Sequence, residues 1–518
     1  MADVDAAPGS FSPRIRRIAL LAGPLLALLV YALLPGQYGD GKGGTAVFSA
    51  AGRATLAVTV WMATWWVTEA VHIAVTALLP ITVFPLLGIA GIDKATAPYA
   101  SDVIYLFFGG FVLAAAIQRW GLDRRIAYGT LALVGTRADR VVAGFMLATA
   151  VLSMWVSNTA TAAMMVPIAL AVVNLTLRQR TGRTLAEHGG IPADSPGDRN
   201  FALALLLGIA YSASIGGIGT LIGSPPNGIL ARFVVQNYGI EVSFVKWLKV
   251  GLPVVALMLP AAWLLLTKVM FRSGIGEIEG GREWVRQELA ALGPLARGER
   301  VTLAVFGATV VLWVTRPLLA KASLGGMAPF AGLSDAGIAM LAAVALFIVP
   351  VDPAHGVRAV DWIAARELPW DVLILFGGGL SLAEAIQANG VADLLGTATQ
   401  GFGGWPVLAV VLAVAALSTF ASELMSNTAQ VATMLPLLAA VAPGVGVHPA
   451  LLLVPCTLGA SAAFMMPVGT PPNAIVFGTG LLTIPQMCKA GFWLNLLGVA
   501  IVTAVTYLLV IPMLVAQG

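Results

Sequence analysis

The 518-residue chain is poor in the residues that usually build covalent, metal or nucleophilic sites. It has two cysteines and four histidines, namely Cys456, Cys488, His72, His188, His355 and His448. The cysteines show no disulfide or thiol pattern, and the histidines are scattered without metal-ligand spacing or a nucleophile partner. These absences argue against a disulfide-stabilised fold, a metal centre and an enzyme site.

Charged residues are also scarce. They make up 10% of the chain, whereas 58% of the residues are hydrophobic and the mean hydropathy is +0.90. Many windows supply the ~20 apolar residues that cross a ~30 Å hydrocarbon core, so a soluble protein is excluded. The net charge of +4 does not indicate a nucleic-acid partner, because the arginines lie in loops between apolar segments. That placement is a membrane topology signal.

Basic residues are missing from long apolar stretches. No Lys or Arg occurs from Glu367 to Cys488, and none occurs within 141–177 or 201–231. An anion bound in these stretches would meet only dipoles, and an uncompensated buried charge costs several kcal/mol or more. Cations bound together with the anion would remove that cost. The absence therefore favours binding of an anion and a cation together.

Two polar motifs interrupt the apolar sequence, and each occurs twice. Ser157-Asn-Thr-Ala160 recurs 269 positions later as Ser426-Asn-Thr-Ala429. Gly223-Ser-Pro-Pro-Asn227 recurs 246 positions later as Gly469-Thr-Pro-Pro-Asn473, and the difference in offset matches a polar insert at 178–200. Helix-breaking polar clusters at corresponding places of two apolar halves are typical of a transporter site between repeats.

The apolar segments predict an all-α polytopic membrane protein. Two long segments, 141–177 and 405–442, carry a Ser-Asn-Thr motif near mid-length or just beyond, so each is either two spans or a re-entrant hairpin. Hairpins leave about eleven transmembrane helices, one at the N-terminus and five in each repeat. An odd number of spans per repeat makes the repeats inverted. Each Pro-Pro-Asn motif predicts a broken helix.

This organisation divides the chain into four parts. We expect an N-terminal helix and loop, a first repeat, a cytosolic linker and a second repeat at 1–53, 54–271, 272–300 and 301–518. Most arginines then lie on one side, which the positive-inside rule makes the cytoplasm, while loops 389–404 and 443–449 outside contain no Lys or Arg. The N-terminus is expected in the cytoplasm and the C-terminus outside.

The motif chemistry suits an anion and a cation. Free N–H groups at helix starts favour anions, whereas carbonyl and hydroxyl oxygens at helix breaks favour a hard cation such as sodium. Ser153 and Ser422 each precede a motif serine by four residues, so one helical turn places a second oxygen on the same face.

Two acidic residues raise further hypotheses. Trp66-Val-Thr-Glu69 and Trp313-Val-Thr-Arg316 correspond at an offset of 247, which suggests an ion pair between Glu69 and Arg316. Glu423, three residues before Ser426, either tunes a cation site or faces water at the edge of a hairpin.

These motifs, together with Trp65-Trp-Val-Thr-Glu-Ala70, resemble the divalent anion/sodium symporter family, the transporters of dicarboxylates, citrate and sulfate. The resemblance covers nearly the whole chain. It implies a homodimer in the inner (plasma) membrane, with eleven helices per protomer. An elevator-type transport domain would carry the hairpins and broken helices past a scaffold of the other spans.

The resemblance also implies roles for individual residues. The substrate carboxylates would be bound by Asn158, Thr159, Asn427 and Thr428, with Ser224, Thr470 and Pro471 beside them. One sodium site would use Ser153, Ser157, Asn158 and the carbonyl of Gly223. The other would use Ser422, Asn427 and the carbonyls of Met425 and Gly469.

Both Ser-Asn-Thr motifs are intact, which resembles dicarboxylate carriers more than citrate carriers. The expected function is sodium-coupled symport of succinate, malate or fumarate, with Na+ as the co-transported ion. Two alternatives stay open: a sodium-independent dicarboxylate exchanger, and a symporter of another divalent anion such as sulfate, tartrate or citrate.

Overall fold

The structure is a computed structural model that describes residues 13–39, 44–188, 190–192, 195–322, 327–402, 404–510 and 512. The described chain is mostly helical, and nine of its helices are long and apolar enough to cross a membrane. The predicted helical membrane fold is confirmed at this level, whereas the count of eleven crossings stays a prediction. Residues 1–12 and 513–518 lie outside the described residues, and with them the predicted locations of the two ends.

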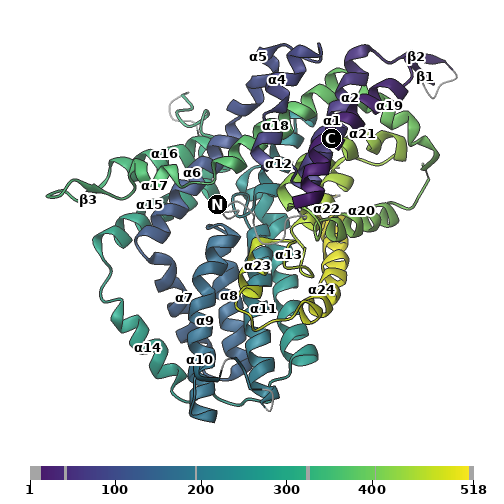
Figure 1. Ribbon diagram of the computed structural model, residues 1–518. Coiled ribbons are helices and arrows are strands. Elements are labelled where there is room, and N and C mark those ends of the chain that lie inside the picture. Colours follow the sequence, from purple (N-terminus) through teal and green to yellow (C-terminus); the bar gives the residue numbers. More distant parts are fainter. Residues whose placement is uncertain are drawn as a thin grey trace.

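The first part of the chain folds into short and long helices that end with α14 (Figure 1). Their bounds are α1 Pro13–Leu33, α2 Ala50–Thr68, α3 Ile73–Thr76, α4 Leu79–Leu86, α5 Ile92–Thr96, η1 Ala97–Ala100, α6 Asp102–Arg119, α7 Leu122–Val134, α8 Ala138–Ser153, α9 Asn158–Thr181, α10 Leu185–His188, α11 Pro196–Ile218, α12 Pro225–Tyr238, α13 Phe244–Leu264, η2 Leu265–Met270 and α14 Gly281–Ala291.

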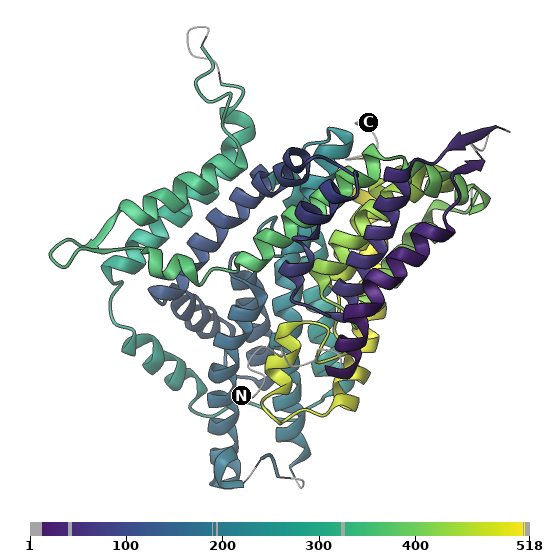
Figure 2. The same ribbon diagram turned by 45° about the horizontal axis from the view of Figure 1, so that its top comes forward.

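The second part follows a similar order. Its helices are α15 Arg297–Leu319, α16 Asp335–Ile348, α17 Trp362–Arg366, α18 Trp370–Ala388, α19 Val391–Ala398, η3 Gln400–Phe402, α20 Val407–Ala421, α21 Asn427–Val445, α22 Ala450–Ala460, α23 Pro471–Phe477, α24 Ile484–Val505 and η4 Thr506–Val510. Two small antiparallel sheets, β1 Gln37–Gly39 with β2 Thr45–Val47 and β3 Pro350–Asp352 with β4 Val357–Arg358, lie at opposite edges of the molecule (Figures 1 and 2).

Corresponding turns in the two halves have the same geometry. Gly121 before α7 and Gly390 before α19 have φ angles of 71° and 72°, and they are 269 positions apart. Glycine adopts this left-handed conformation without the cost that a Cβ imposes. The chain therefore turns in the same way after α6 and after α18.

The two halves also pack against each other through matched glycines. An ideal Cβ on Gly109 of α6 would lie 2.5 Å from the carbonyl oxygen of Ala339 on α16. A Cβ on Gly378, 269 positions later on α18, would overlap the carbonyl oxygen of Ala77, next to α3. Such small residues let helix backbones approach closely. A glycine of each half therefore allows one close backbone contact with the other half.

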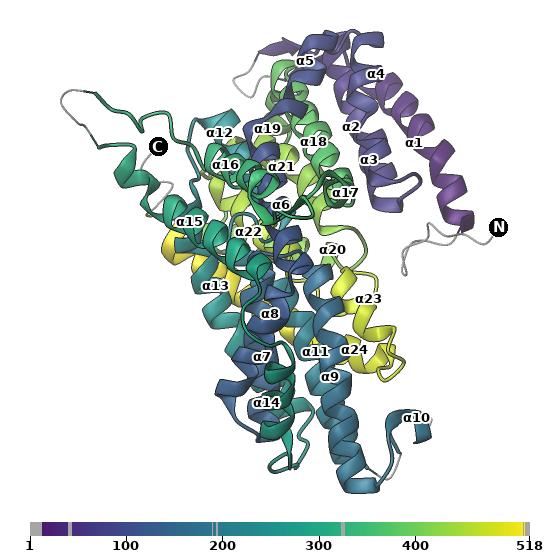
Figure 3. The same ribbon diagram turned by 90° about the vertical axis from the view of Figure 1, so that its left-hand side faces the viewer.

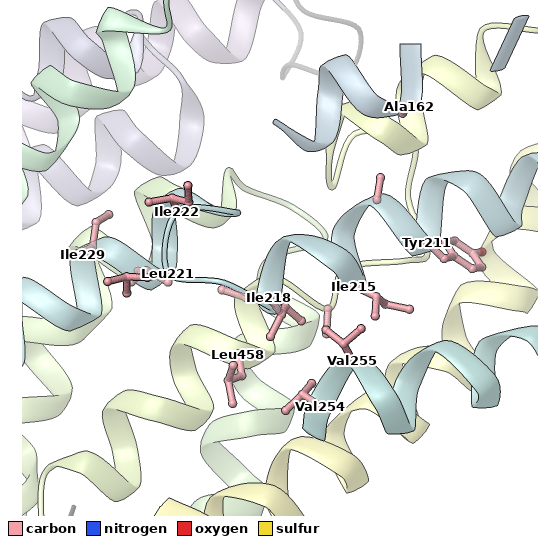
Figure 4. Packing of buried hydrophobic residues seen from close by; sticks show 14 of the residues in the cluster. Ala162, Tyr211, Ile215, Ile218, Leu221, Ile222, Ile229, Val254, Val255 and Leu458 are labelled. Atoms are coloured by element: carbon pink, nitrogen blue, oxygen red, sulfur yellow. The ribbon is translucent and has the colours of Figure 1, made fainter. Parts of the chain in front are cut away.

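The centre of the molecule is the broken helix α11–α12. The 18-residue apolar window of α11 is completely buried, and α11 packs against α8, α9, α13 and α23. Figure 4 shows Ile215 and Ile218 before the break, Leu221 and Ile222 within it and Ile229 after it. In Figure 3, α1–α5 lie at one end of the body and α7–α10 with α14 at the other.

Candidate functional site

A cavity of about 1280 Å³ lies where both Ser-Asn-Thr motifs and both Pro-Pro-Asn motifs meet. All the residues predicted to bind substrate line this cavity: Asn158, Thr159, Ser224, Asn427, Thr428, Thr470 and Pro471. Of the predicted sodium ligands, Ser157, Gly223, Met425 and Gly469 also line it. Ser153 and Ser422 are fully buried behind the wall. Residues up to 314 positions apart in the chain thus form one polar surface.

The cavity wall contains the starts of four helices, which fall into two kinds. α9 and α21 begin at Asn158 and Asn427, and the first amides of a helix have no intrahelical partner. These two helix starts therefore offer N–H donors and the positive end of a helix dipole to an anion. α12 and α23 each begin with two prolines, which lack an N–H, so that the wall there offers hydroxyl and carbonyl oxygens.

Few basic side chains line this cavity. Among the described residues that line the cavity, Arg119 is the basic one, and its Nη1 lies 2.7 Å from Oδ2 of Asp361. The lining also includes the acidic Glu69, Glu367 and Asp371. An anion in this cavity therefore needs helix dipoles, N–H donors and accompanying cations rather than a free basic side chain.

The first predicted cation site contains a tight group of oxygens. The Ser153 hydroxyl lies 2.6 Å from Oδ1 of Asn158 and 2.6 Å from the carbonyl oxygen of Ala213. One hydroxyl proton bonds only one of these two acceptors, so three oxygens share one hydrogen. Hydroxyl, amide and backbone oxygens are the donor set of a hard cation. The residues present therefore fit sodium, which we treat as cargo.

The second predicted site contains an acceptor without a donor. Oδ1 of Asn427 is buried and has no hydrogen-bond partner among the described residues, while the Ser422 hydroxyl donates to the carbonyl oxygen of Thr419 at 2.9 Å. A buried acceptor without a partner is costly in the absence of a ligand. This site also fits a cation.

The asparagines of the Pro-Pro-Asn motifs perform a role that the predicted residue set left out. Nδ2 of Asn227 donates to the carbonyl oxygens of Gly217 and Thr220, both at 2.9 Å. Nδ2 of Asn473 donates to the carbonyl oxygens at the matching positions, Ala463 at 3.4 Å and Met466 at 3.0 Å. The amide of Asn227 thus joins α12 to the end of α11 and to the break, whereas that of Asn473 joins α23 to two residues of the unwound segment before it. The repeated asparagine was the available sequence signal for this role.

Glu423 does not face water. It is only 3% exposed, and its carboxylate accepts hydrogen bonds from the backbone N–H groups of Phe464, Met465 and Met466 and from Nδ2 of Asn495. Of the two alternatives raised by the sequence, the water-facing one is wrong. Asn495 is not part of any repeated motif, so nothing in the sequence indicated that it would donate a hydrogen bond to Glu423.

The hypothesis of a Glu69–Arg316 ion pair is also wrong. The Arg316 guanidinium lies 2.6 Å from Oε1 of Glu241 and 2.7 Å from Oδ1 of Asp335. Glu69 caps the end of α2 and lines the cavity. Both acidic partners of Arg316 thus lie elsewhere in the chain than the position that its sequence correspondence indicated.

Comparison with known proteins gives a consistent result. The family model described as the sodium:sulfate symporter transmembrane region matches residues 24–515. A "Sodium-dependent dicarboxylate transporter SdcS" of Staphylococcus saprophyticus is 40% identical over 498 residues, 96% of this chain and 92% of that protein. The protein of the same name from Staphylococcus aureus is 40% identical over 491 residues, 95% of this chain and 90% of that one.

Two solved structures share the fold at low sequence identity. The YdaH transporter of Alcanivorax borkumensis gives a TM-score of 0.54 at 13% identity and covers 95% of this chain and 98% of its own. MtrF of Neisseria gonorrhoeae also gives a TM-score of 0.54, at 10% identity, and covers 96% of this chain and 95% of its own.

Proposed function

Because the chain belongs to the sodium:sulfate symporter family, we propose that it is a secondary active transporter of C4-dicarboxylates (succinate, malate or fumarate) coupled to sodium, and that it is not an enzyme. The observation that carries this proposal is the cavity wall. Two helix starts offer N–H donors to an anion, while a buried group of oxygens around Ser153 and the buried Oδ1 of Asn427 suit cations. The names of the two staphylococcal relatives support the same substrate and ion.

The two motif asparagines explain how cation and anion binding are coupled. The amide of an asparagine can direct its oxygen to a cation and its NH2 group to a carboxylate. Oδ1 of Asn158 lies beside the Ser153 hydroxyl in the first predicted cation site. Oδ1 of Asn427, in the second predicted cation site, has no hydrogen-bond partner among the described residues. Bound sodium would fix the orientation of both amides and reduce the charge that the dianion brings. Each ligand then strengthens the binding of the other.

We further propose the architecture of two inverted five-helix repeats with eleven crossings, working by an elevator movement. The pairs α8–α9 and α20–α21 would be re-entrant hairpins, α11–α12 and α22–α23 the broken helices, and α14 the cytosolic linker helix. The shared φ angles of Gly121 and Gly390 and the matched bonds of Asn227 and Asn473 support the repeat. The protomers would form homodimers in the plasma membrane.

The conformation would be inward-open. The cavity extends from the motifs to the Arg119–Asp361 pair, whose side chains are 31% and 42% exposed. Arg119, the last residue of α6, is one of the arginines that the positive-inside rule assigns to the cytoplasm. Substrate would therefore leave along this path during uptake.

The test is uptake of radiolabelled succinate into proteoliposomes, with and without an inward sodium gradient and with and without internal succinate. We expect saturable uptake into empty vesicles that depends on sodium and fails with potassium. Uptake that requires internal dicarboxylate and ignores sodium would replace the proposal with an exchanger. If sulfate, tartrate or citrate is transported and succinate is not, that anion would replace succinate as the proposed substrate.

A further inference from the structure

The carboxylate of Glu423 occupies an unusual position within the second broken helix. Oε1 accepts the N–H of Phe464 at 2.8 Å, the N–H of Met465 at 2.9 Å and Nδ2 of Asn495 at 2.7 Å. Oε2 accepts the N–H of Met466 at 2.9 Å. All four partners are donors, which is the environment of an ionised carboxylate. Glu423 therefore replaces helical carbonyls as the acceptor for three consecutive amides.

Among the described residues, no basic side chain forms an ion pair with this carboxylate. The sequence from Glu367 to Cys488 has no Lys or Arg, and no ion pair involves Glu423 within the described part of the chain. Amide dipoles stabilise the negative charge without cancelling it. A buried charge of this kind favours a cation nearby.

The predicted second cation site lies directly beside this charge. An ideal Cβ built on Gly469 would lie 2.9 Å from Oε2 of Glu423, so the carboxylate touches the residue whose carbonyl is a predicted sodium ligand. Ser422, another predicted ligand, is the preceding residue in the chain. Asn427, whose Oδ1 has no hydrogen-bond partner among the described residues, is a third predicted ligand of this site.

The first site has no such charge. The position that matches Glu423, 269 residues earlier, is Met154. Its backbone carbonyl accepts a hydrogen bond from the hydroxyl of Thr220, and its side chain packs against Gly219. The oxygens of the first site are thus all neutral.

We propose that Glu423 makes the two cation sites unequal. It is a positioning residue that holds the unwound segment 464–466, and its charge makes the Ser422–Asn427–Gly469 site bind sodium more tightly than the Ser153–Asn158–Gly223 site. The second site therefore fills first as sodium rises. A unit charge a few ångströms from a cation changes its affinity by about tenfold or more even with strong screening. This inference rests on the proposed function.

The experiment measures sodium binding without transport. The thermal midpoint of the purified protein is recorded as sodium replaces potassium at constant ionic strength, with no dicarboxylate present. The wild-type protein is compared with Glu423→Gln, which removes the charge, and with Asn495→Ala, which removes one donor and keeps the charge. We expect the half-saturating sodium concentration to rise about tenfold or more in Glu423→Gln and less than about threefold in Asn495→Ala.

Equal shifts in the two variants would overturn the charge assignment, and so would a shift below threefold in Glu423→Gln. If Glu423→Gln does not fold, the order in which the two cation sites fill is measured instead with Ser422→Ala and Ser153→Ala. The inference requires that Ser422→Ala removes stabilisation at low sodium and Ser153→Ala removes it only at high sodium, and the reverse order would refute it. If the wild-type protein gains no stability from sodium over potassium, the proposed function fails as well.

Discussion

The two broken helices share a motif but unwind to different extents. α11 continues to Ile218 and α12 begins at Pro225, whereas α22 stops at Ala460 and α23 begins at Pro471. The longer break coincides with the amides of residues 464–466 that bond to the Glu423 carboxylate. In the first half the hydroxyl of Thr220 closes the shorter break, because it accepts the N–H of Gly223 at 3.0 Å.

This difference shows that a repeated motif does not determine the local structure around it. Both asparagines of the Pro-Pro-Asn motifs make the same bonds across their breaks. The residue that meets each break differs, being Met154 at the end of α8 for the first break and Glu423 after α20 for the second. A single acidic side chain supplies acceptors that a helix would otherwise provide, and the helix ends earlier.

The largest expected effect on transport comes from replacing the asparagines of the two Ser-Asn-Thr motifs. Asn158→Ala and Asn427→Ala should each reduce succinate uptake to the background of protein-free liposomes. Each substitution removes an amide that we assign to both the cation and the anion. Uptake, size-exclusion profile and thermal midpoint should be measured together, so that lost binding is separated from misfolding. Near-normal uptake in either variant would refute the assignment of that half.

A large structural effect is expected where α11 and α22 touch α8 and α20. A Cβ on Gly216 would overlap the carbonyl oxygen of Ala150 on α8, whereas a Cβ on Gly459 would lie 3.0 Å from the carbonyl oxygen of Ala415 on α20. Gly216→Ala should therefore destabilise the protein by about 2–4 kcal/mol and Gly459→Ala by about 1 kcal/mol or less. The thermal midpoints of the purified variants would reveal this ranking, and equal losses would contradict it.

A smaller contrast is expected between the motif asparagines. Asn227 makes two bonds of 2.9 Å, whereas the bonds of Asn473 are longer and its break is also held by Glu423. Loss of buried hydrogen bonds costs about 1–3 kcal/mol, and Asn227→Ala should lie near the upper end of that range. Asn473→Ala should cost less. Urea or thermal unfolding of the two variants would test the order, and a greater loss in Asn473→Ala would show that Glu423 does not support the second break.

The smallest effect is expected at the rim of the cavity. The backbone N–H of Ala364, and then the Arg119 guanidinium, hold the pKa of the Asp361 carboxyl below its ordinary value. A carboxyl with a lowered pKa stabilises the fold above its unfolded pKa of about 3.9, and that contribution is lost as the pH falls through its folded pKa.

The two side chains of the pair are partly exposed to solvent, so Asp361→Asn should lower the thermal midpoint by less than about 3 °C. The difference between wild type and variant should stay constant from pH 8 to pH 5.5. Thermal scans of both proteins at several pH values provide the check. A difference that disappears by pH 5.5 would mean that the carboxyl is already protonated there.

Some features followed directly from residue patterns. The motif repeats predicted that Asn158, Asn427, Thr470 and Ser224 lie together, and all four line one cavity. The prolines predicted the helix breaks, because they have no N–H and clash with the preceding turn. In contrast, the partner of Arg316 was not predictable, because correspondence between repeats says nothing about distance across the fold.

The sequence by itself therefore determined the helical membrane fold, the two halves and the residues of the motifs, because hydropathy, proline and glycine act locally. Only the tertiary structure decided the environment of Glu423. Its carboxylate depends on amides 41 to 43 residues away and on Asn495, 72 residues away. Whether a buried acid meets water, a base or a row of free N–H groups is a property of the packed helices, since all its partners lie far from Glu423 along the chain.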